Sequence, residues 1–165
     1  KLDLNGFVAA MAEKSEGNFM YLRHVLSAIA EGWLASFAVT DLPHGLRANY
    51  RQHWEQMRNR DAQAFSVLYL PVVCVLGAAR EAVPVGLVAK WTKLEPKQVI
   101  RILREWISFI HVEVKPGGEK RYRIYHTAFR DYLQEEVDPG LNTYHAMIAD
   151  TALGKVRKRI AELEQ

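Results

Sequence analysis

Apolar side chains recur at helical spacing through the first third of the chain and predict three helices there. The first follows Asp3 and the second follows Asn18, two residue types that cap helix N-termini. Gly17 suits the left-handed end of the first helix. The second helix is apolar nearly all round, so we expect it to be buried. The predicted stripes are Leu4, Phe7, Val8 and Met11; Phe19, Tyr21, Leu22, Val25, Leu26 and Ile29; and Leu46, Tyr50, Trp54 and Met57.

A connection over 32–43 joins the second helix to the third. We expect it to be anchored by three large apolar side chains, Trp33, Leu34 and Phe37. Leu42-Pro43 then gives a turn and helix-start signal. The arginines Arg47, Arg51 and Arg58 mark the solvent side of the third helix.

After a polar boundary at 59–61 the pattern predicts a different arrangement. A long apolar helix covers 65–79, with Pro71 as a position for a kink, and a turn follows at 81–84. A short helix is predicted over 85–91, and Pro96 suits the first turn of the next one. That helix should direct Val99, Ile100, Leu103, Trp106 and Ile107 inward.

The pattern next predicts a β-hairpin. Polar and apolar residues alternate over 109–114 and again over 121–125, and Pro116-Gly117-Gly118 between them is a hairpin tip. A helix over about 127–136 follows. Helix, short helix, helix and hairpin is the element order of a winged helix-turn-helix.

These elements predict a mainly α fold. We expect a helical subdomain at 1–60, a winged-helix domain with one β-hairpin at 61–137, and a helical tail at 138–165. The inner stripe of the tail should consist of Tyr144, Ile148, Ala152, Val156, Ile160 and Leu163.

Composition narrows the function classes. The chain has 165 residues, 49% of them hydrophobic, which is enough for one core or two small ones. The net charge of +3 is too small to argue for nucleic acid by itself. The one cysteine, Cys74, excludes an internal disulfide, and we expect it to be a buried thiol in a reducing, cytoplasmic compartment. The apolar run at 65–79 is too short to span a bilayer, so no membrane partner is expected.

Local motifs for catalysis or metal binding are missing. His24, His53, His111 and His145 show no metal-ligand spacing with carboxylates or with Cys74. No Ser/His/Asp or Cys/His arrangement has local support, which argues against a hydrolase.

The strongest candidate for chemistry is His126. It stands between the predicted strand ending at Tyr125 and the helix that carries Phe129, Tyr132 and Leu133. An imidazole at a helix N-terminus can donate to an anion or complete a backbone turn. Both roles remain open from the residues alone.

Several segments resemble the STAND-class signalling NTPases, the NACHT and NB-ARC family. Lys14-Ser15-Glu16-Gly17-Asn18-Phe19-Met20-Tyr21-Leu22 is similar to a stretch of the family's helical lid, and Leu42-Pro43-His44-Gly45-Leu46 with Tyr50 to its last lid helix. Tyr125 to Leu133 resembles the family's winged-helix motif "H-x-S-F-x-D-Y-L", with Ala128 in place of the usual serine. Tyr144-His145 is similar to the segment leading to C-terminal repeats.

The resemblance implies a nucleotide-sensing role. In this family the winged-helix histidine reaches the β-phosphate of bound ADP and holds the closed, inactive state; His126 matches that position. Gly17 and Phe19 match a part of the lid that approaches the adenine side. The alternative for them is a glycine helix end and a core phenylalanine, and Pro43 is expected to be structural.

The chain contains no G-x-x-x-x-G-K-[ST] phosphate loop and no Walker-B strand. By the resemblance it is therefore a piece of a longer protein and not an enzyme by itself. ADP or ATP with magnesium would be held by a nucleotide-binding domain of the parent protein. The implied partners are that domain, a C-terminal repeat domain, and other copies of the parent.

Two other functions stay open. A winged-helix module can bind nucleic acid, with Lys97, Arg101 and Arg104 on the helix in the groove and Lys120 and Arg121 on the wing at phosphate. Glu105, Glu113 and Glu119 dilute that charge, and Lys115 and Arg123 complete the wing's cations. The third possibility is a protein-interaction scaffold.

Overall fold

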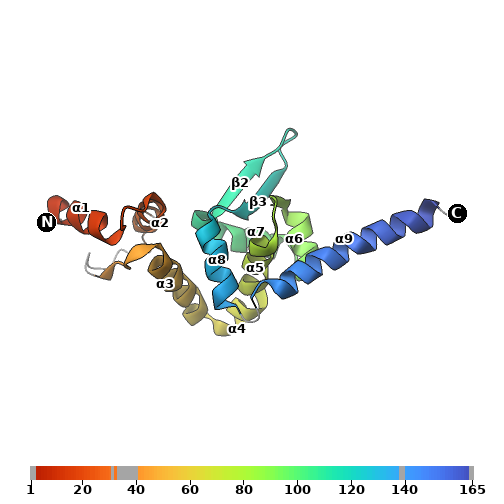
Figure 1. The fold of residues 1–165 in the computed structure, drawn as a ribbon, viewed down its shortest axis with the longest axis horizontal. Helices are drawn as coiled ribbons and strands as arrows, with labels where there is room; N and C mark the ends of the chain where they lie inside the picture. Colours follow the sequence, from red (N-terminus) through yellow and green to blue (C-terminus); the bar gives the residue numbers. More distant parts are fainter. Residues whose placement is uncertain (1–2, 31, 33–40, 138–139, 164–165) are drawn as a thin grey trace. The chain divides into compact units, whose positions relative to one another are not determined.

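The computed structural model describes residues 3–30, 32, 41–137 and 140–163, without the side chains of 155, 158 and 161. It divides into two compact units, Lys1–Ala62 and Gln63–Gln165. The fold is mainly α with one small antiparallel sheet, as the sequence predicts (Figure 1).

The first unit contains α1 (Leu4–Lys14), α2 (Phe19–Ala30) and α3 (Gly45–Arg60). The oxygen of the Asn18 side chain accepts hydrogen bonds from the backbone N–H groups of Met20 and Tyr21, at 2.9 and 3.4 Å, and so caps α2 as predicted. Asp3 occupies the N-cap position of α1 without a side-chain cap bond. The predicted stripe of α3 is buried, and its three solvent-side arginines are exposed.

The burial predicted for α2 is wrong for half of its apolar stripe, and the predicted apolar face of α1 is partly exposed as well. Only Tyr21, His24 and Val25 of α2 are buried. Phe19 is 75% exposed and Leu4 of α1 is 66% exposed. Helical periodicity identifies an apolar face, but it does not say whether this unit supplies a partner for it. Other exposed members are Val8, Leu26 and Ile29, and the anchors Trp33, Leu34 and Phe37 lie outside the described residues.

The second unit is built around the long apolar helix. It runs through α4 (Ala62–Ala64), a π-helical segment η2 (Phe65–Tyr69) and α5 (Leu70–Ala78). Pro71 lacks the N–H of an α-helical bond, and its ring would crowd the carbonyl four residues earlier. The wider π turn stands directly before it, closed by the Leu70 N–H donating to the Phe65 carbonyl. The interruption predicted at Pro71 is therefore a π bulge.

Two helices and the sheet follow along the chain. They are α6 (Val85–Thr92), α7 (Pro96–Glu105), a 3₁₀ turn η3 (Ile107–Phe109), β2 (Ile110–Val114) and β3 (Lys120–Ile124). A reciprocal capping box between Glu95 and Gln98 fixes the start of α7. The predicted hairpin is present, with Val112 opposite Tyr122. The sheet also contains a third strand, β1 (Val83–Pro84), in the order β1-β3-β2, where the sequence predicted only a turn.

The core of the second unit lies between α5, α7 and α8 (Thr127–Glu136). Phe129 stacks on Phe109 at a centroid distance of 4.9 Å and on Trp106 at 6.0 Å. Gly77 lets α5 approach α8 closely, because a Cβ there would lie 3.0 Å from the Leu133 side chain. The inward residues predicted for α7 are buried or half-buried, except Ile107, which is 41% exposed.

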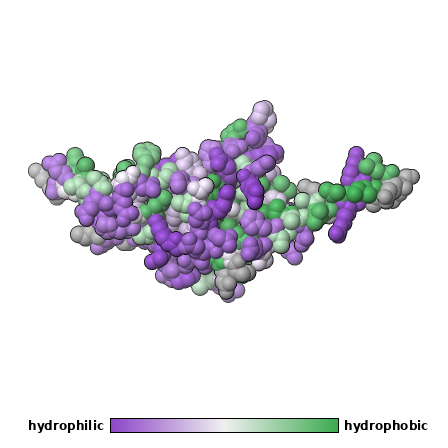
Figure 2. Space-filling model, in the orientation of Figure 1, coloured by the Kyte–Doolittle hydropathy of each residue, from purple (hydrophilic) through white to green (hydrophobic). Residues whose placement is uncertain are grey.

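Helix α9 (Asn142–Leu163) packs against α5 and α6 near its start. There Cys74 is buried, as predicted, and burial raises the pKa of its thiol to about 12. Farther along, the predicted inner stripe is exposed, and Figure 2 shows hydrophobic side chains along the outer part of this helix. The exposed members are Ala152, Val156, Ile160 and Leu163. The stripe therefore lacks a partner within the described part of this unit.

No single helix among the described residues is both long and apolar enough to cross a membrane. The consecutive helices Gly45–Arg60 and Ala62–Ala78 reach the required length and composition only when taken together.

Candidate functional site

His126 stands at the junction that the sequence predicted. The strand β3 ends at Ile124, and the Tyr125 N–H donates to the Phe109 carbonyl at 2.9 Å, which holds the end of the strand against η3. His126 then has extended backbone angles and is the N-cap residue of α8. Its Nδ1 accepts a hydrogen bond from the Ala128 N–H at 3.1 Å. Of the two predicted roles, the completion of a backbone turn is therefore present in the structure.

This cap determines which nitrogen of the imidazole carries hydrogen. Because Nδ1 accepts a hydrogen bond, it uses its lone pair, and the proton of the neutral ring is on Nε2. The half-buried side chain is thus held by one nitrogen and has a donor on the other. Capping a helix and donating to an anion are compatible roles for one imidazole.

Ala128 takes part in the cap through its backbone. The N–H that His126 accepts from belongs to Ala128, so the bond does not need the hydroxyl of the serine in the family motif.

The other two residues predicted to approach nucleotide lie in the first unit. Gly17 has a φ of +73°, and a Cβ built there would meet no atom within 4 Å. Phe19 is the first residue of α2 and is largely exposed, so the alternative prediction of a core phenylalanine is wrong. Gly17 and Phe19 are close in sequence, whereas His126 belongs to the other unit. The Pro43 carbonyl accepts from the Tyr21 hydroxyl, in keeping with a structural role.

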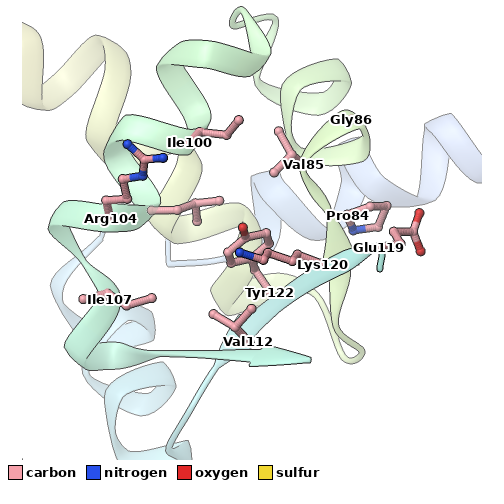
Figure 3. Close-up of a pocket in the computed structure, with 11 residues that line it drawn as sticks. Pro84, Val85, Gly86, Ile100, Arg104, Ile107, Val112, Glu119, Lys120 and Tyr122 are labelled. Carbon is pink, nitrogen blue, oxygen red and sulfur yellow. The ribbon is translucent and has the colours of Figure 1, made fainter. Parts of the chain in front are cut away.

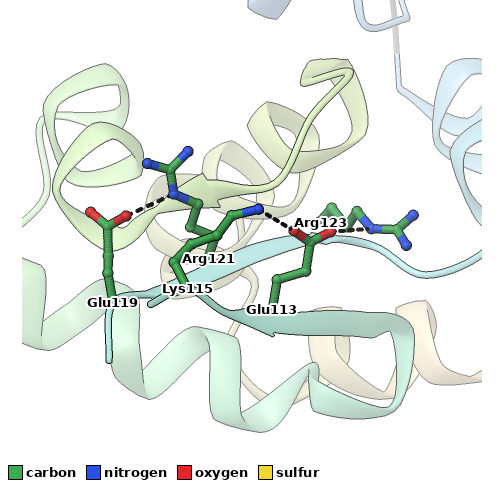
Figure 4. Close-up of polar contacts among 5 residues, drawn as sticks. All are labelled: Glu113, Lys115, Glu119, Arg121 and Arg123. Atoms are coloured by element: carbon green, nitrogen blue, oxygen red, sulfur yellow. Dashed lines mark hydrogen bonds and ion pairs between the residues drawn. The ribbon is translucent and has the colours of Figure 1, made fainter. Parts of the chain in front are cut away.

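Most cations of the hairpin are already paired with carboxylates (Figure 4). Glu119 binds Arg121 at 2.7 Å, and Glu113 binds both Lys115 and Arg123 at 3.1 Å. Hydrogen bonds from Lys115 and then Arg123 lower the pKa of the Glu113 carboxyl. These pairs reduce the positive field that a phosphate backbone would meet.

Four of the cations predicted to contact nucleic acid are exposed: Lys97, Arg101, Arg104 and Lys120. Within the described part of the chain none of them is in an ion pair. Glu105, the acidic residue in the same stretch of α7, accepts from the Tyr69 hydroxyl at 3.0 Å. The predicted nucleic-acid cations that lack an ion pair therefore lie on α7 and at the start of β3, with the Glu105 carboxylate beside them.

A pocket of about 560 Å³ opens between α7, the start of α6 and one face of the sheet (Figure 3). We call it the α7–hairpin groove. Its apolar lining includes Pro84, Val85, Ile100, Ile107, Val112 and Tyr122, and its polar edge is Arg104, Glu119 and Lys120. The groove was not predicted from the sequence. The alternation of apolar and polar residues in the two strands could have indicated it, because this alternation puts Val112 and Tyr122 on one face.

In comparisons with known proteins, no family model, no curated protein and no solved structure matches the chain. Among the described residues, no group of three or more His, Cys, Asp or Glu side chains could hold a metal ion.

Proposed function

We propose that this chain is the regulatory lid and winged-helix module of a STAND-class signalling NTPase. The first unit is the helical lid, and α6, α7 and the β2–β3 hairpin of the second unit are the winged helix. The order of these elements and the motifs around Gly17, Pro43 and His126 support this assignment.

The observation that carries the proposal is the cap at His126. Its Nδ1 is engaged with the Ala128 N–H, so Nε2–H is the group that donates to the β-phosphate of ADP. A hydrogen bond to a charged phosphate is stronger than one between neutral groups. The fixed ring orientation also reduces the entropy lost when that bond forms. His126 thereby stabilises the closed, inactive state.

The remaining parts follow from this assignment. The nucleotide and magnesium are held by a separate nucleotide-binding domain, because this chain contains no phosphate loop. Gly17 and the exposed ring of Phe19 approach the adenine side. When ATP replaces ADP, the module moves away, which makes the protein a two-state switch biased by nucleotide contacts.

The test measures ADP in the full-length protein. His126→Ala removes both the cap and the phosphate donor, and we expect it to lower the ADP that copurifies and to raise basal activity. His126→Ser is the matched variant. A serine hydroxyl can cap α8, but its short side chain lacks the reach of an imidazole.

If the proposal is correct, both variants lose ADP although His126→Ser keeps most of the thermal stability that His126→Ala loses. The proposal is wrong if both proteins retain ADP and keep basal activity at the wild-type level. A loss confined to His126→Ala would assign His126 to helix capping alone and would also contradict the proposal.

A further inference from the structure

The two faces of the β2–β3 hairpin have opposite character. Glu113, Arg121 and Arg123 alternate with the apolar residues and pair with other charged groups. On the other face, Val112 and Tyr122 form a cross-strand pair that lines the α7–hairpin groove. Val114 extends this apolar face toward the hairpin tip and is 64% exposed. On one face of the hairpin the charged side chains are thus in ion pairs, and on the other face apolar surface is exposed.

The walls of the groove are side chains. Ile100 comes from α7, Ile107 from the turn η3, and Val112 and Tyr122 from the sheet; Figure 3 shows these side chains around one space. The strand beneath it, β3, is the middle strand, so both of its backbone edges are already paired. An occupant cannot bind here by adding a strand to β3. Walls made of side chains suit an occupant that binds through its own side chains, as an amphipathic helix does in an apolar groove.

The charge at the edge of the groove selects the chemistry of the occupant. Arg104 and Lys120 line the groove, and no acidic group among the described residues pairs with either. The carboxylate at that edge, Glu119, is bound to Arg121 at 2.7 Å. The unpaired charge there is positive, which complements a partner that carries carboxylates beside its apolar side chains.

Two of the described helices with exposed apolar faces, α2 and the outer part of α9, match that charge poorly. The outer part of α9 carries Arg157 beside its apolar stripe, and its carboxylate Glu162 is already bound to Arg159 at 3.3 Å. Helix α2 contains no acidic residue. A second copy docking through α9 would place like charges together, and α2 would leave Arg104 and Lys120 unmatched.

We propose that the α7–hairpin groove binds an acidic amphipathic helix of a partner protein. Apolar side chains of that helix occupy the space over Val112 and Tyr122, and its carboxylates pair with Arg104 and Lys120. This site is separate from the His126 junction and requires no nucleotide. Binding at this groove can therefore be tested independently of the proposed contact between His126 and ADP.

The experiment is a fluorescence anisotropy titration of the 165-residue chain. The probe is a fluorescein-labelled 15-residue model helix with leucine and phenylalanine on one face and glutamate on the other. Two comparison probes are the same peptide with lysine in place of glutamate, and a labelled duplex DNA. We expect saturable binding of the acidic peptide, and affinity at least about tenfold lower for the lysine peptide.

Variants locate the binding. The double variant Arg104→Gln/Lys120→Gln and the single variant Ile107→Ser change exposed positions, so both should fold as the wild type does. Each should weaken binding of the acidic peptide about tenfold. Arg80→Gln/Lys90→Gln removes two exposed cations outside the groove and should leave the affinity unchanged.

Three results would overturn the proposal. The first is no saturable binding of the acidic peptide, and the second is equal affinity for the lysine peptide. The third is tighter binding of duplex DNA that is lost in Arg104→Gln/Lys120→Gln, which would make this surface a nucleic-acid interface.

Discussion

The two units use phenylalanine in opposite ways. In the second unit Phe129 is 1% exposed and is enclosed by other aromatic rings, whereas Phe19 begins α2 of the first unit with most of its surface uncovered. In the second unit α7 and α8 bury their apolar faces, whereas the outer stripe of α9 stays exposed. In the first unit α3 buries its stripe, but α1 and α2 bury only part of their apolar residues and leave the rest exposed. An uncovered face of this kind suits a lid that closes over another domain, as we propose.

The largest expected effect comes from changing these two phenylalanines. Phe129→Ala removes a fully buried ring and should lower the free energy of unfolding of the second unit by about 3–5 kcal/mol. Phe19→Ala should change the stability of the first unit by no more than about 0.5 kcal/mol. Differential scanning calorimetry of both variants measures the two effects. Equal losses would show that Phe19 is as well packed as Phe129 and would remove the contrast between the units.

Acid should destabilise the first unit selectively. The pKa of His53 is lowered from 6.5 to about 3. Burial is the largest cause, followed by the charges of Arg60 and then of His24. Between those values the unfolded chain binds a proton that the folded unit does not. Stability therefore falls as the pH drops from about 6.5 toward 3, by up to about 1.4 kcal/mol per pH unit.

The loss of stability can be measured by hydrogen exchange of peptides from α3 at pH values from 7 to 4. The exchange rates are corrected for the intrinsic rate at each pH. His53→Gln cannot gain a charge and should flatten the profile. An unchanged acid dependence in that variant would assign the effect to other groups.

The cap on α8 should have a smaller effect. His126→Ala removes the acceptor for the Ala128 N–H and should cost the second unit about 1 kcal/mol. His126→Ser should recover most of that loss. Urea unfolding followed by circular dichroism compares the three proteins; an unchanged midpoint in His126→Ala would mean that the cap contributes nothing to stability.

The smallest expected effect is on the ion-paired face of the hairpin. Glu113→Gln breaks the pairs with Lys115 and Arg123, but these side chains are exposed and solvent screens them. The melting temperature should not change measurably. A clear drop would show that this face is better ordered than its exposure suggests.

The sequence predicted the region from α7 to α8 well because the local signals agree there. Pro96 starts α7, the two glycines mark the hairpin tip, and His126 lies where the strand period gives way to the helix period. The strand β1 was missed since two residues cannot show a period of two. It forms because β3 offers a free edge to Val83 and Pro84.

Burial was harder to predict than helix boundaries. The stripes of α3 and of the outer part of α9 have the same periodicity, yet Trp54 is buried and Val156 is exposed. Whether a stripe is covered depends on a partner far away in sequence or on another chain, which periodicity does not contain. The α7–hairpin groove was missed for a related reason, because it forms only where α6, α7 and the sheet meet.

The most direct test of the nucleotide-sensing proposal is the dissociation rate of a fluorescent ADP analogue from the full-length protein. His126→Ser keeps an N-cap on α8 and removes the Nε2–H donor. The proposal predicts dissociation at least about tenfold faster than in the wild type, the loss expected for one hydrogen bond to a charged group. A dissociation rate equal to that of the wild type would contradict it and would leave His126 as a helix cap.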